Sequence, residues 1–344
     1  MELGAITSIL SSKEARVYEQ APTSLKNNKL VEPFEQLVYM YGVPNYNEID
    51  PSGVFCAIYM LLFGMMFGDL GQGLVIVLAG LFMKLKKKSP FGGLLMRIGF
   101  SSTIFGFFYD SFFGYEHVIS KVVPADIFIR PFDNTMTMLY AAIALGLVLL
   151  CFAYGLSIVN KLRTNQPMEA WLGKEGAVGL LLFISLLLTA ASAAGLVKIP
   201  TPIPVAGLII GSILLLFHEP IWNLIHGKRP LYEQKASDYY VENGFSLVEA
   251  FLSLLSNSLS FIRVGAFALN HVGLFVAFHT LAAIINTPSG SVIMAILGNI
   301  LVLGLEGMIV FIQGLRLMYY ELFSKYFVGE GRLFKPARLE EVQL

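Results

Sequence analysis

Charged residues are scarce in this sequence. Asp, Glu, Lys and Arg together account for 14% of its 344 residues, whereas a typical soluble domain has about 25%. Hydrophobic residues make up 56%, and the mean hydropathy is +0.67. This composition is not that of a soluble globular protein, and it predicts a polytopic membrane protein that contacts the lipid bilayer directly.

The sequence also lacks an excess of charge of either sign, and it has few cysteines. Its 24 basic and 24 acidic residues balance, so no global charge predicts nucleic acid as a partner. The two cysteines, Cys56 and Cys151, lie in apolar runs without the spacing of metal ligands. They are typical of buried packing residues rather than of a disulfide or a metal site. Neither a metal nor another cofactor is expected.

The sequence supports neither a secretory leader nor a nucleotide-binding loop. Residues 1–50 show no charged segment followed by an apolar run and a cleavage site, so the amino terminus is expected in the cytoplasm. The stretch FGMMFGDLGQG (63–73) follows no strand and lacks the P-loop lysine, which excludes a phosphate loop. Its glycines are expected to permit close helix contact. Asp69 is expected to cap the following helix, with an aqueous vestibule as the alternative.

Eight apolar segments are candidates for membrane crossing, because a helix needs about 20 apolar residues to span the hydrocarbon core. The first two are short and could form one interrupted span, but two crossings give a consistent orientation. The expected fold is therefore an all-α polytopic membrane protein with about eight transmembrane helices. The segments are residues 54–67, 70–84, 91–110, 135–159, 176–197, 203–222, 245–286 and 291–323.

Basic residues give the orientation. With the amino terminus inside, eighteen lysines and arginines lie on the inner side and three on the outer side, as the positive-inside rule requires. Both termini are then cytoplasmic. The inner residues are Lys13, Arg16, Lys26, Lys29, Lys84, Lys86, Lys87, Lys88, Lys161, Arg163, Lys174, Lys228, Arg229, Lys235, Lys325, Arg332, Lys335 and Arg338, and the outer ones are Lys121, Arg130 and Lys198.

The last two segments are longer than one crossing and contain no proline. An unbroken helix over residues 245–286 would be roughly 60 Å long. Each segment could instead be a tight hairpin, which the charge rule allows. Turn signals favour single, steeply tilted helices, because Gly244 precedes the first, NTPSG separates the two, and no comparable cluster interrupts either.

Polar residues form a stripe along each long segment. On the first, one side of the helix is polar at 100° per residue; it carries Glu249, Ser253, Ser256, Ser260, Arg263 and Asn270, with Asn257 and His271 at its margin. On the second, a polar residue recurs every seven positions; these are Asn299, Glu306, Gln313 and Tyr320, with Arg316 near the same edge. The two stripes are expected to face each other.

Ionisable residues within these long apolar segments are energetically unfavourable. A charge at the bilayer centre costs from about 3 to more than 10 kcal/mol. Glu249 and Arg263 are fourteen residues apart and Glu306 and Arg316 are ten apart, so pairing within either helix is excluded. A structural cross-helix pair, such as Arg263 with Glu306, stays open, but an ion-conducting path is the preferred interpretation. His271 is equally compatible with helix packing and proton relay; the serines favour packing or bonds to their own helix.

Four stretches resemble the membrane subunit of rotary V-type and A-type ATPases, called subunit a or subunit I. They are EAFLSLLSNSLSFIRVGAFALNHVGL (249–274), EGMIVFIQGLRLMYYELFSKYFVGEGRLFKP (306–336), FGMMFGDLGQG, and PTSLKN with PFEQLVYMYGVPNYNEIDPS (22–52). The resemblance covers nearly the whole chain. It departs from the family at RVGAF, where some members have RLWAL or RLLAL, and in front, where about fifty residues stand in place of a large cytoplasmic domain.

The resemblance implies a function and roles for single residues. Arg263 matches the family's indispensable arginine and Arg316 its second arginine, while Glu249, Glu306 and His271 match residues of its aqueous half-channels. Gln313, Asn257 and Ser260 lie on the same faces and are expected to line these routes. The implied partners are a proteolipid c/K-type ring, the peripheral stalk and the soluble ATPase head. The chain itself is not expected to be an enzyme, since ATP hydrolysis would belong to other subunits.

The expected organisation follows from both lines of reasoning. Residues 1–50 form a short cytoplasmic segment, residues 51–326 a transmembrane ion-translocating domain, and residues 327–344 a cytoplasmic tail, in a prokaryotic plasma membrane. Two other functions stay open. A secondary transporter would bind an anionic solute at the intramembrane arginines without a ring, and a structural scaffold would use the polar stripes only for assembly.

Overall fold

The structure is a computed structural model that describes residues 22–87, 89–116, 118–121, 135–195, 197–227, 235–285 and 287–334. These residues are almost entirely helical, as predicted. The amino-terminal half contains α2 (Glu32–Tyr41), α3 (Ser52–Met66), α4 (Leu70–Lys87), α5 (Pro90–Phe108), α6 (Thr135–Arg163), α7 (Pro167–Leu172) and α8 (Ala177–Ala193). The other half contains α9 (Pro202–Leu216), α10 (His218–Ile225), α11 (Ala236–Ser260), α12 (Ile262–Ile285), α13 (Pro288–Leu301), η1 (Val302–Glu306), α14 (Gly307–Arg316), η2 (Leu317–Phe323) and α15 (Ser324–Tyr326), where η denotes a π-helix.

Each of the eight predicted segments forms a helix, but the count of eight crossings is not confirmed. Among the described residues, five helices are long and apolar enough to span a bilayer, or six if α9 and α10, bent by 72°, count as one. The helix α3 has only 15 residues, and α4 carries Lys84, Lys86 and Lys87 in its last turn. The apolar helices nevertheless make this an integral membrane protein.

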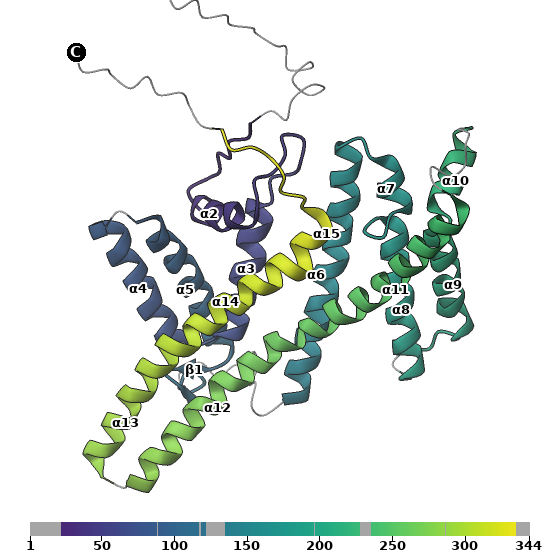
Figure 1. Cartoon of the computed structure of the whole chain (residues 1–344). Helices are drawn as coiled ribbons and strands as arrows, with labels where there is room; N and C mark the ends of the chain where they lie inside the picture. Colours follow the sequence, from purple (N-terminus) through teal and green to yellow (C-terminus); the bar gives the residue numbers. More distant parts are fainter. Residues whose placement is uncertain are drawn as a thin grey trace, which may run out of the picture.

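The last two segments are single long helices, as predicted, and not hairpins. Ser237–Ile285 runs for 49 residues and Ser289–Tyr326 for 38, so the first is about 74 Å long at 1.5 Å per residue. Figure 1 shows α14 crossing obliquely in front of α3, and α11 crossing obliquely in front of α6 and α8. These two helices cross the others at a steep angle.

The described parts of the predicted amino-terminal segment and tail pair with each other. The backbone N–H of Thr23 donates to the Arg332 carbonyl at 2.7 Å, and that of Gly331 donates to the Val43 carbonyl at 2.8 Å. Figure 1 places this pairing at the end of the bundle where α2 and α15 lie. Eight of the basic residues that set the predicted orientation lie outside the described residues: Lys13, Arg16, Lys88, Arg130, Lys228, Arg229, Lys335 and Arg338.

Tyr59 and Phe55 join the helical core to the second long helix. The two rings stack with their centroids 5.5 Å apart, and the Tyr59 hydroxyl donates to the Phe311 carbonyl at 2.9 Å. Phe55 also packs against Phe323 with the centroids 5.5 Å apart. Both α3 residues are fully buried, so α3 is a fixed support for α14 and η2.

Glycines bring α4 and α5 into backbone contact. Gly73 and Gly80 on α4, and Gly92, Gly99 and Gly106 on α5, recur every seven residues and so share one side of each helix. A Cβ on Gly99 would lie 2.8 Å from the Val77 nitrogen, and one on Gly80 would lie 2.6 Å from the Met96 nitrogen. Small residues allow such close helix packing in membranes, and the glycines of FGMMFGDLGQG serve helix contact as predicted.

We expect Gly99→Ala to destabilise the protein by about 1–3 kcal/mol, because the new methyl group meets backbone that cannot move aside. The measurement is thermal unfolding of the purified protein in detergent. Gly155→Ala is the matched control, since a Cβ on Gly155 in α6 would meet no atom within 4 Å. Equal melting temperatures for the two variants would contradict the packing argument.

Candidate functional site

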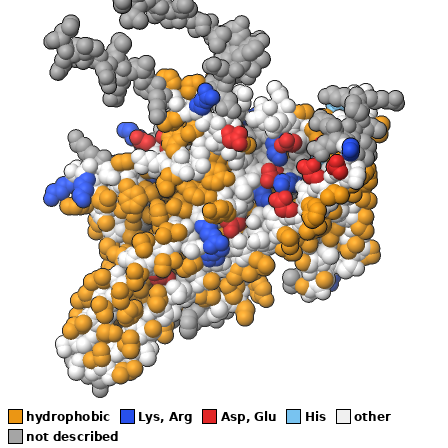
Figure 2. All heavy atoms as spheres, viewed as in Figure 1, with side chains coloured by type: hydrophobic (Ala, Val, Ile, Leu, Met, Phe, Trp, Pro, Cys, Tyr) orange, Lys and Arg blue, Asp and Glu red, His pale blue; other side chains and the backbone are white. Residues whose placement is uncertain are grey.

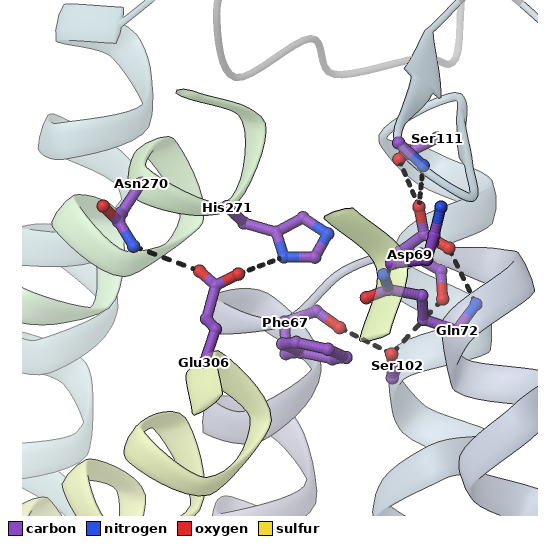
Figure 3. A network of polar contacts seen from close by, with 10 residues as sticks. Phe67, Asp69, Gln72, Ser102, Ser111, Asn270, His271 and Glu306 are labelled. Carbon is purple, nitrogen blue, oxygen red and sulfur yellow. Dashed lines mark hydrogen bonds and ion pairs between the residues drawn. The ribbon is translucent and has the colours of Figure 1, made fainter. Parts of the chain in front are cut away.

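Asp69 caps α4 and also holds the β-hairpin that follows α5. Its Oδ1 accepts from the Gln72 backbone N–H at 2.8 Å, which confirms the predicted cap. The same carboxylate accepts from the Ser111 hydroxyl at 2.8 Å and from the Gly114 N–H at 2.8 Å, at the two strands β1 (Ser111–Phe112) and β2 (Tyr115–Glu116) and the turn between them. Fully buried and saturated with donors, Asp69 is a structural carboxylate (Figure 3).

His271 and Glu306 form a buried pair between the two long helices. Nδ1 of His271 lies 2.9 Å from Oε2 of Glu306, and the two side chains are 3% and 4% exposed. Asn270 Nδ2 donates to the other carboxylate oxygen at 3.3 Å. The Phe67 ring packs edge-on against the imidazole with the centroids 4.8 Å apart. Figure 3 shows the carboxylate of Glu306 pointing toward both Asn270 and the histidine ring.

This pair answers one question that the sequence left open. Glu306 binds His271 and Asn270, so the cross-helix pair suggested for Arg263 and Glu306 is not the one that forms. Nε2 of His271 is buried without a hydrogen-bond partner among the described residues. An imidazole with one nitrogen on a carboxylate and the other unused can take up a proton on one side and give it up on the other.

Arg263 follows directly after an anchored point of the first long helix. Phe261 is fully buried, and its ring fills the space beside Gly146 of α6. The Val264 N–H donates to the Phe261 carbonyl at 3.0 Å, three residues back, which tightens the helix at this point. The Arg263 side chain is half-buried, and its Nη1 is buried without a hydrogen-bond partner among the described residues.

Arg263 is close to a second arginine and to an acid. The charges of Arg316 and Glu321 both act on the Arg263 guanidinium. Arg316 is exposed, whereas Glu321 is 4% exposed, with its Oε2 unpaired in the described structure. The charges of the two predicted arginines and of a buried carboxylate therefore act on one another across the two long helices.

The regular helical period of the sequence does not select Glu321, for a geometric reason. In an α-helix a residue five positions after Arg316 lies 140° away from it at 100° per residue. Residues Leu317–Phe323 form the π-helix η2 instead, whose wider turns bring position 321 back toward the arginine side. Tyr320, predicted to continue the polar face, is 69% exposed. The signal that could have found Glu321 was its acidic group in the apolar run 291–323.

A groove surrounds Glu249 on the other half of the first long helix. It has a volume of about 890 Å³ and is lined by residues that include Glu242, Glu249, Lys174, Ser253 and Asn257. The Glu249 carboxylate is exposed and lies 3.4 Å from the Lys174 ammonium. Figure 2 shows charged side chains gathered over the region of α7 and α11, with a smaller charged group beside α14.

Most hydrogen bonds of the remaining predicted residues run along the same helix, and Ser260 also bonds the Glu321 side chain on the second long helix. Asn257 Nδ2 donates to Ser253 Oγ at 3.2 Å. Ser260 donates to the Ser256 carbonyl at 2.9 Å, as expected for serines that bond to their own helix. Gln313 is half-buried, and its Oε1 has no partner in the described part of the chain.

The predicted residues therefore form three groups rather than one. Glu249 lies fourteen residues before Arg263, about 21 Å along the helix, and His271 lies eight residues after it, about 12 Å in the opposite direction. The open acidic groove and the closed histidine–glutamate pair thus lie on opposite sides of the arginines.

Comparison with known proteins agrees with this architecture. Residues 2–113 match the model of the V-type ATPase 116kDa subunit family. The chain is 28% identical to the A-type ATP synthase subunit I of Saccharolobus solfataricus over 92% of its length and 54% of that protein. It is 29% identical to the A-type ATP synthase subunit I of Archaeoglobus fulgidus over 92% of its length and 53% of that protein.

A bacterial relative matches over a shorter stretch. The V-type ATP synthase subunit I 2 of Treponema pallidum is 28% identical over 46% of this chain and 39% of that protein. The chain spans about half the length of the first two relatives. With the fold of an integral membrane protein and two long helices that cross the others obliquely, the chain is similar to A-type ATP synthase subunit I proteins over 92% of its length, and its residues 2–113 match the V-type ATPase 116kDa subunit family.

Proposed function

We propose that the chain is the static ion-translocating subunit of a rotary V-type or A-type ATPase. It provides two aqueous half-channels and an arginine, and it couples transport of H⁺ or Na⁺ to rotation of a proteolipid ring. The observation that carries this proposal is the order of polar groups along the first long helix. The Glu249 groove, the arginine pair and the His271–Glu306 pair follow one another along this helix.

Arg263 acts on the carboxylate that each ring subunit carries. Such a carboxyl must be neutral, by protonation or by ion binding, to face lipid, because an ionised group is heavily penalised there. A guanidinium attracts the ionised form, so an approaching carboxyl loses its ion near Arg263 and is reloaded after it has passed. The fixed cation also blocks a direct leak between the half-channels, since arginine does not give up its proton.

The two groups beside the arginines line the half-channels. Glu249, Asn257 and Ser260 line the route that begins at the open groove, and His271 with Glu306 lines the other. Gln313 and Arg316 lie on the second long helix between them and support Arg263. The unpaired Nη1 of Arg263 and the exposed side chain of Arg316 favour this assignment, because a guanidinium that serves only helix packing is expected to be fully paired.

The long helices also offer a face to the ring. Only 28% of the apolar window of Ser237–Ile285 and 22% of that of Ser289–Tyr326 are buried within the chain, compared with 44% for Pro90–Phe108. The same residues carry many exposed apolar side chains, such as Ile284, Ile293 and Ile300. We infer that this side contacts a proteolipid ring as well as lipid.

The peripheral stalk and the soluble ATPase head are the other expected partners, and ATP hydrolysis takes place there, not in this chain. Both termini lie in the cytoplasm of a prokaryotic cell, with the chain in the plasma membrane. The names of the A-type ATP synthase relatives support this assembly.

Arg263→Ala should reduce ATP-driven ion transport by about a hundredfold or more, because the other guanidinium, that of Arg316, belongs to the second long helix and does not take the position of Arg263. The measurement is ATP-driven ion uptake by the reconstituted complex, with assembly checked by co-purification of the ring. Arg163→Ala, at the exposed end of α6, is the control and should transport normally. Normal pumping by an assembled Arg263→Ala complex would refute the assignment.

Glu306→Gln and Glu249→Gln should each slow transport by about tenfold or more and change its pH profile, since each removes an acid from a proton or ion route. Initial rates of uptake over a pH series provide the test. Glu169→Gln, whose carboxylate is exposed and 3.7 Å from Lys161, serves as a matched control. If both variants keep the normal rate and profile, the half-channel roles are wrong.

Co-purification separates this function from an ion-coupled secondary transporter that binds an anionic solute at the arginines. An affinity tag on the chain, used on membranes in mild detergent, should retain a proteolipid ring and soluble ATPase subunits. A transporter would purify without them and would bind or move a solute alone. Recovery of the chain by itself, with solute transport in liposomes, would favour the transporter.

A further inference from the structure

An apolar slot lies between the α4–α5 hairpin and the second long helix. It has a volume of about 310 Å³ and is lined only by apolar side chains and one glycine. Its walls come from residues 75–79 of α4, 91–98 of α5 and 303–311 of the second long helix, and the buried Phe63 of α3 also lines it. The walls on α5 and on the second long helix are roughly 10 to 12 Å long at 1.5 Å per residue, so the slot is elongated along the helices.

The slot is closed at one end and open along one side. At the end where α4 begins, Gln72 Nε2 donates to Asn299 Oδ1 on α13 at 2.9 Å, which joins α4 to the second long helix. Farther along the slot, Ala79 of α4 and Met308 of α14 are both exposed. The slot therefore opens between these two residues, on the side from which α4 continues toward its last turn.

Lys86 lies on the slot side of that last turn. At 100° per residue it is about 20° from both Val75 and Ala79 around the α4 axis, and it lies about 10 Å beyond Ala79. Its ammonium is 5.1 Å from the centroid of the exposed Phe82 ring, which keeps it near the apolar face. Lys84, by contrast, is about 140° from Ala79. Figure 2 shows basic side chains at the end of α4, beside a hydrophobic surface.

We propose that the slot binds one hydrocarbon tail of an anionic phospholipid, with the lipid phosphate at Lys86. An apolar cavity does not hold water, so hydrocarbon is the filling that a bilayer offers. Lys86 forms no ion pair with a carboxylate of the described residues, and a phospholipid brings an anion and an apolar chain in one molecule. The basic end of α4 is predicted to face the cytoplasm, where anionic lipids attract such residues. This site does not depend on the proposed function.

The bound tail packs against the turn that carries Glu306. Leu303 belongs to η1, and Gly307 follows Glu306 directly; both line the slot, whereas Glu306 binds His271 between the two long helices. A Cβ on Gly307 would meet only the Phe67 ring, at 3.9 Å, so the glycine leaves its space to the tail. The lipid thus supports a π-helical turn, a rare conformation, from the side of the α4–α5 hairpin.

The test measures lipid binding to the purified full chain in detergent after its lipids have been removed. Phosphatidylglycerol or phosphatidylcholine with the same tails is added, and bound lipid is counted by native mass spectrometry. One phosphatidylglycerol should bind at least about fivefold more tightly than phosphatidylcholine and raise the melting temperature. Lys86→Gln should weaken phosphatidylglycerol binding by about fivefold, the effect of one lysine beside an anionic lipid. Lys84→Gln is the matched control and should bind as the unchanged protein does.

A second pair of variants tests the slot itself. Ala79→Phe fills it and should reduce binding of both lipids by about tenfold or more, because the ring takes the place of the tail. Ala141→Phe, at an exposed position of α6, is the control and should bind normally. If Ala79→Phe does not fold, Gly307→Leu takes its place as the filling variant.

Four results would each overturn the inference. They are equal affinity for the two lipids, equal weakening by Lys84→Gln and Lys86→Gln, normal binding by a folded slot-filling variant, and recovery of a membrane protein in place of lipid when a photoreactive group at position 79 is activated in native membranes. The last of these would assign the slot to a partner helix.

Discussion

The cost of an uncompensated charge in the lipid layer is the constraint on which the rest of this molecule depends. Arg263 and Arg316 carry permanent charges within apolar helices, and a lipid-facing position for either would be strongly unfavourable. The chain itself compensates part of the Arg263 charge, since the buried carboxylate of Glu321 acts on Arg263. The compensation is incomplete, because Nη1 of Arg263 is left without a partner in the described structure. In the proposed mechanism, the passing ring carboxylate supplies the missing interaction.

Backbone geometry adjusts the polar faces that this constraint requires. Two π-helical segments interrupt the second long helix, and each ends at or contains a buried acid, Glu306 in η1 and Glu321 in η2. A π turn shifts the residues that follow it around the helix axis. The second helix can therefore present Glu306 to His271 and Glu321 to the arginines without a break in its length. Support from Tyr59 and Phe55 on α3 fixes the helix at this level.

Much of the fold followed from hydrophobicity and turn residues. All eight apolar segments became helices, and the two unbroken ones followed from the absence of proline and from NTPSG. The number of crossings did not follow, because the first two segments were recognised as short but counted as two crossings, and hydropathy does not show that α9 and α10 bend by 72°. The cap at Asp69 was predictable from its place before a helix, but its bonds to the hairpin at Ser111 and Gly114 were not. Those bonds join residues more than forty positions apart, and no local pattern encodes them.

For the candidate site, a regular helical period identified most residues but not their partners. It selected Glu306 and His271 separately, and only the packing of two helices shows that they bind each other. The regular period missed Glu321 because residues in the π-helix η2 are not spaced at 100° around the helix axis. It also passed over Lys325, which counts as an ordinary inner-side lysine in the charge rule although it is buried against Ser253 and Tyr154.

The polar groups around Glu249 and Glu306 differ in how their charges are shielded. This difference fits an ion path that the fold interrupts between the two groups. Glu249 lies in an open groove, where water screens its charge and an exposed ion pair with Lys174 is sufficient. Glu306 is closed off from solvent, so His271 and Asn270 take the place of water around its carboxylate. A continuous water path would remove the need for this second kind of shielding. Because the arginines lie between the groups, an ion in the proposed mechanism crosses that interval only on a moving carboxylate, and transport without rotation is prevented.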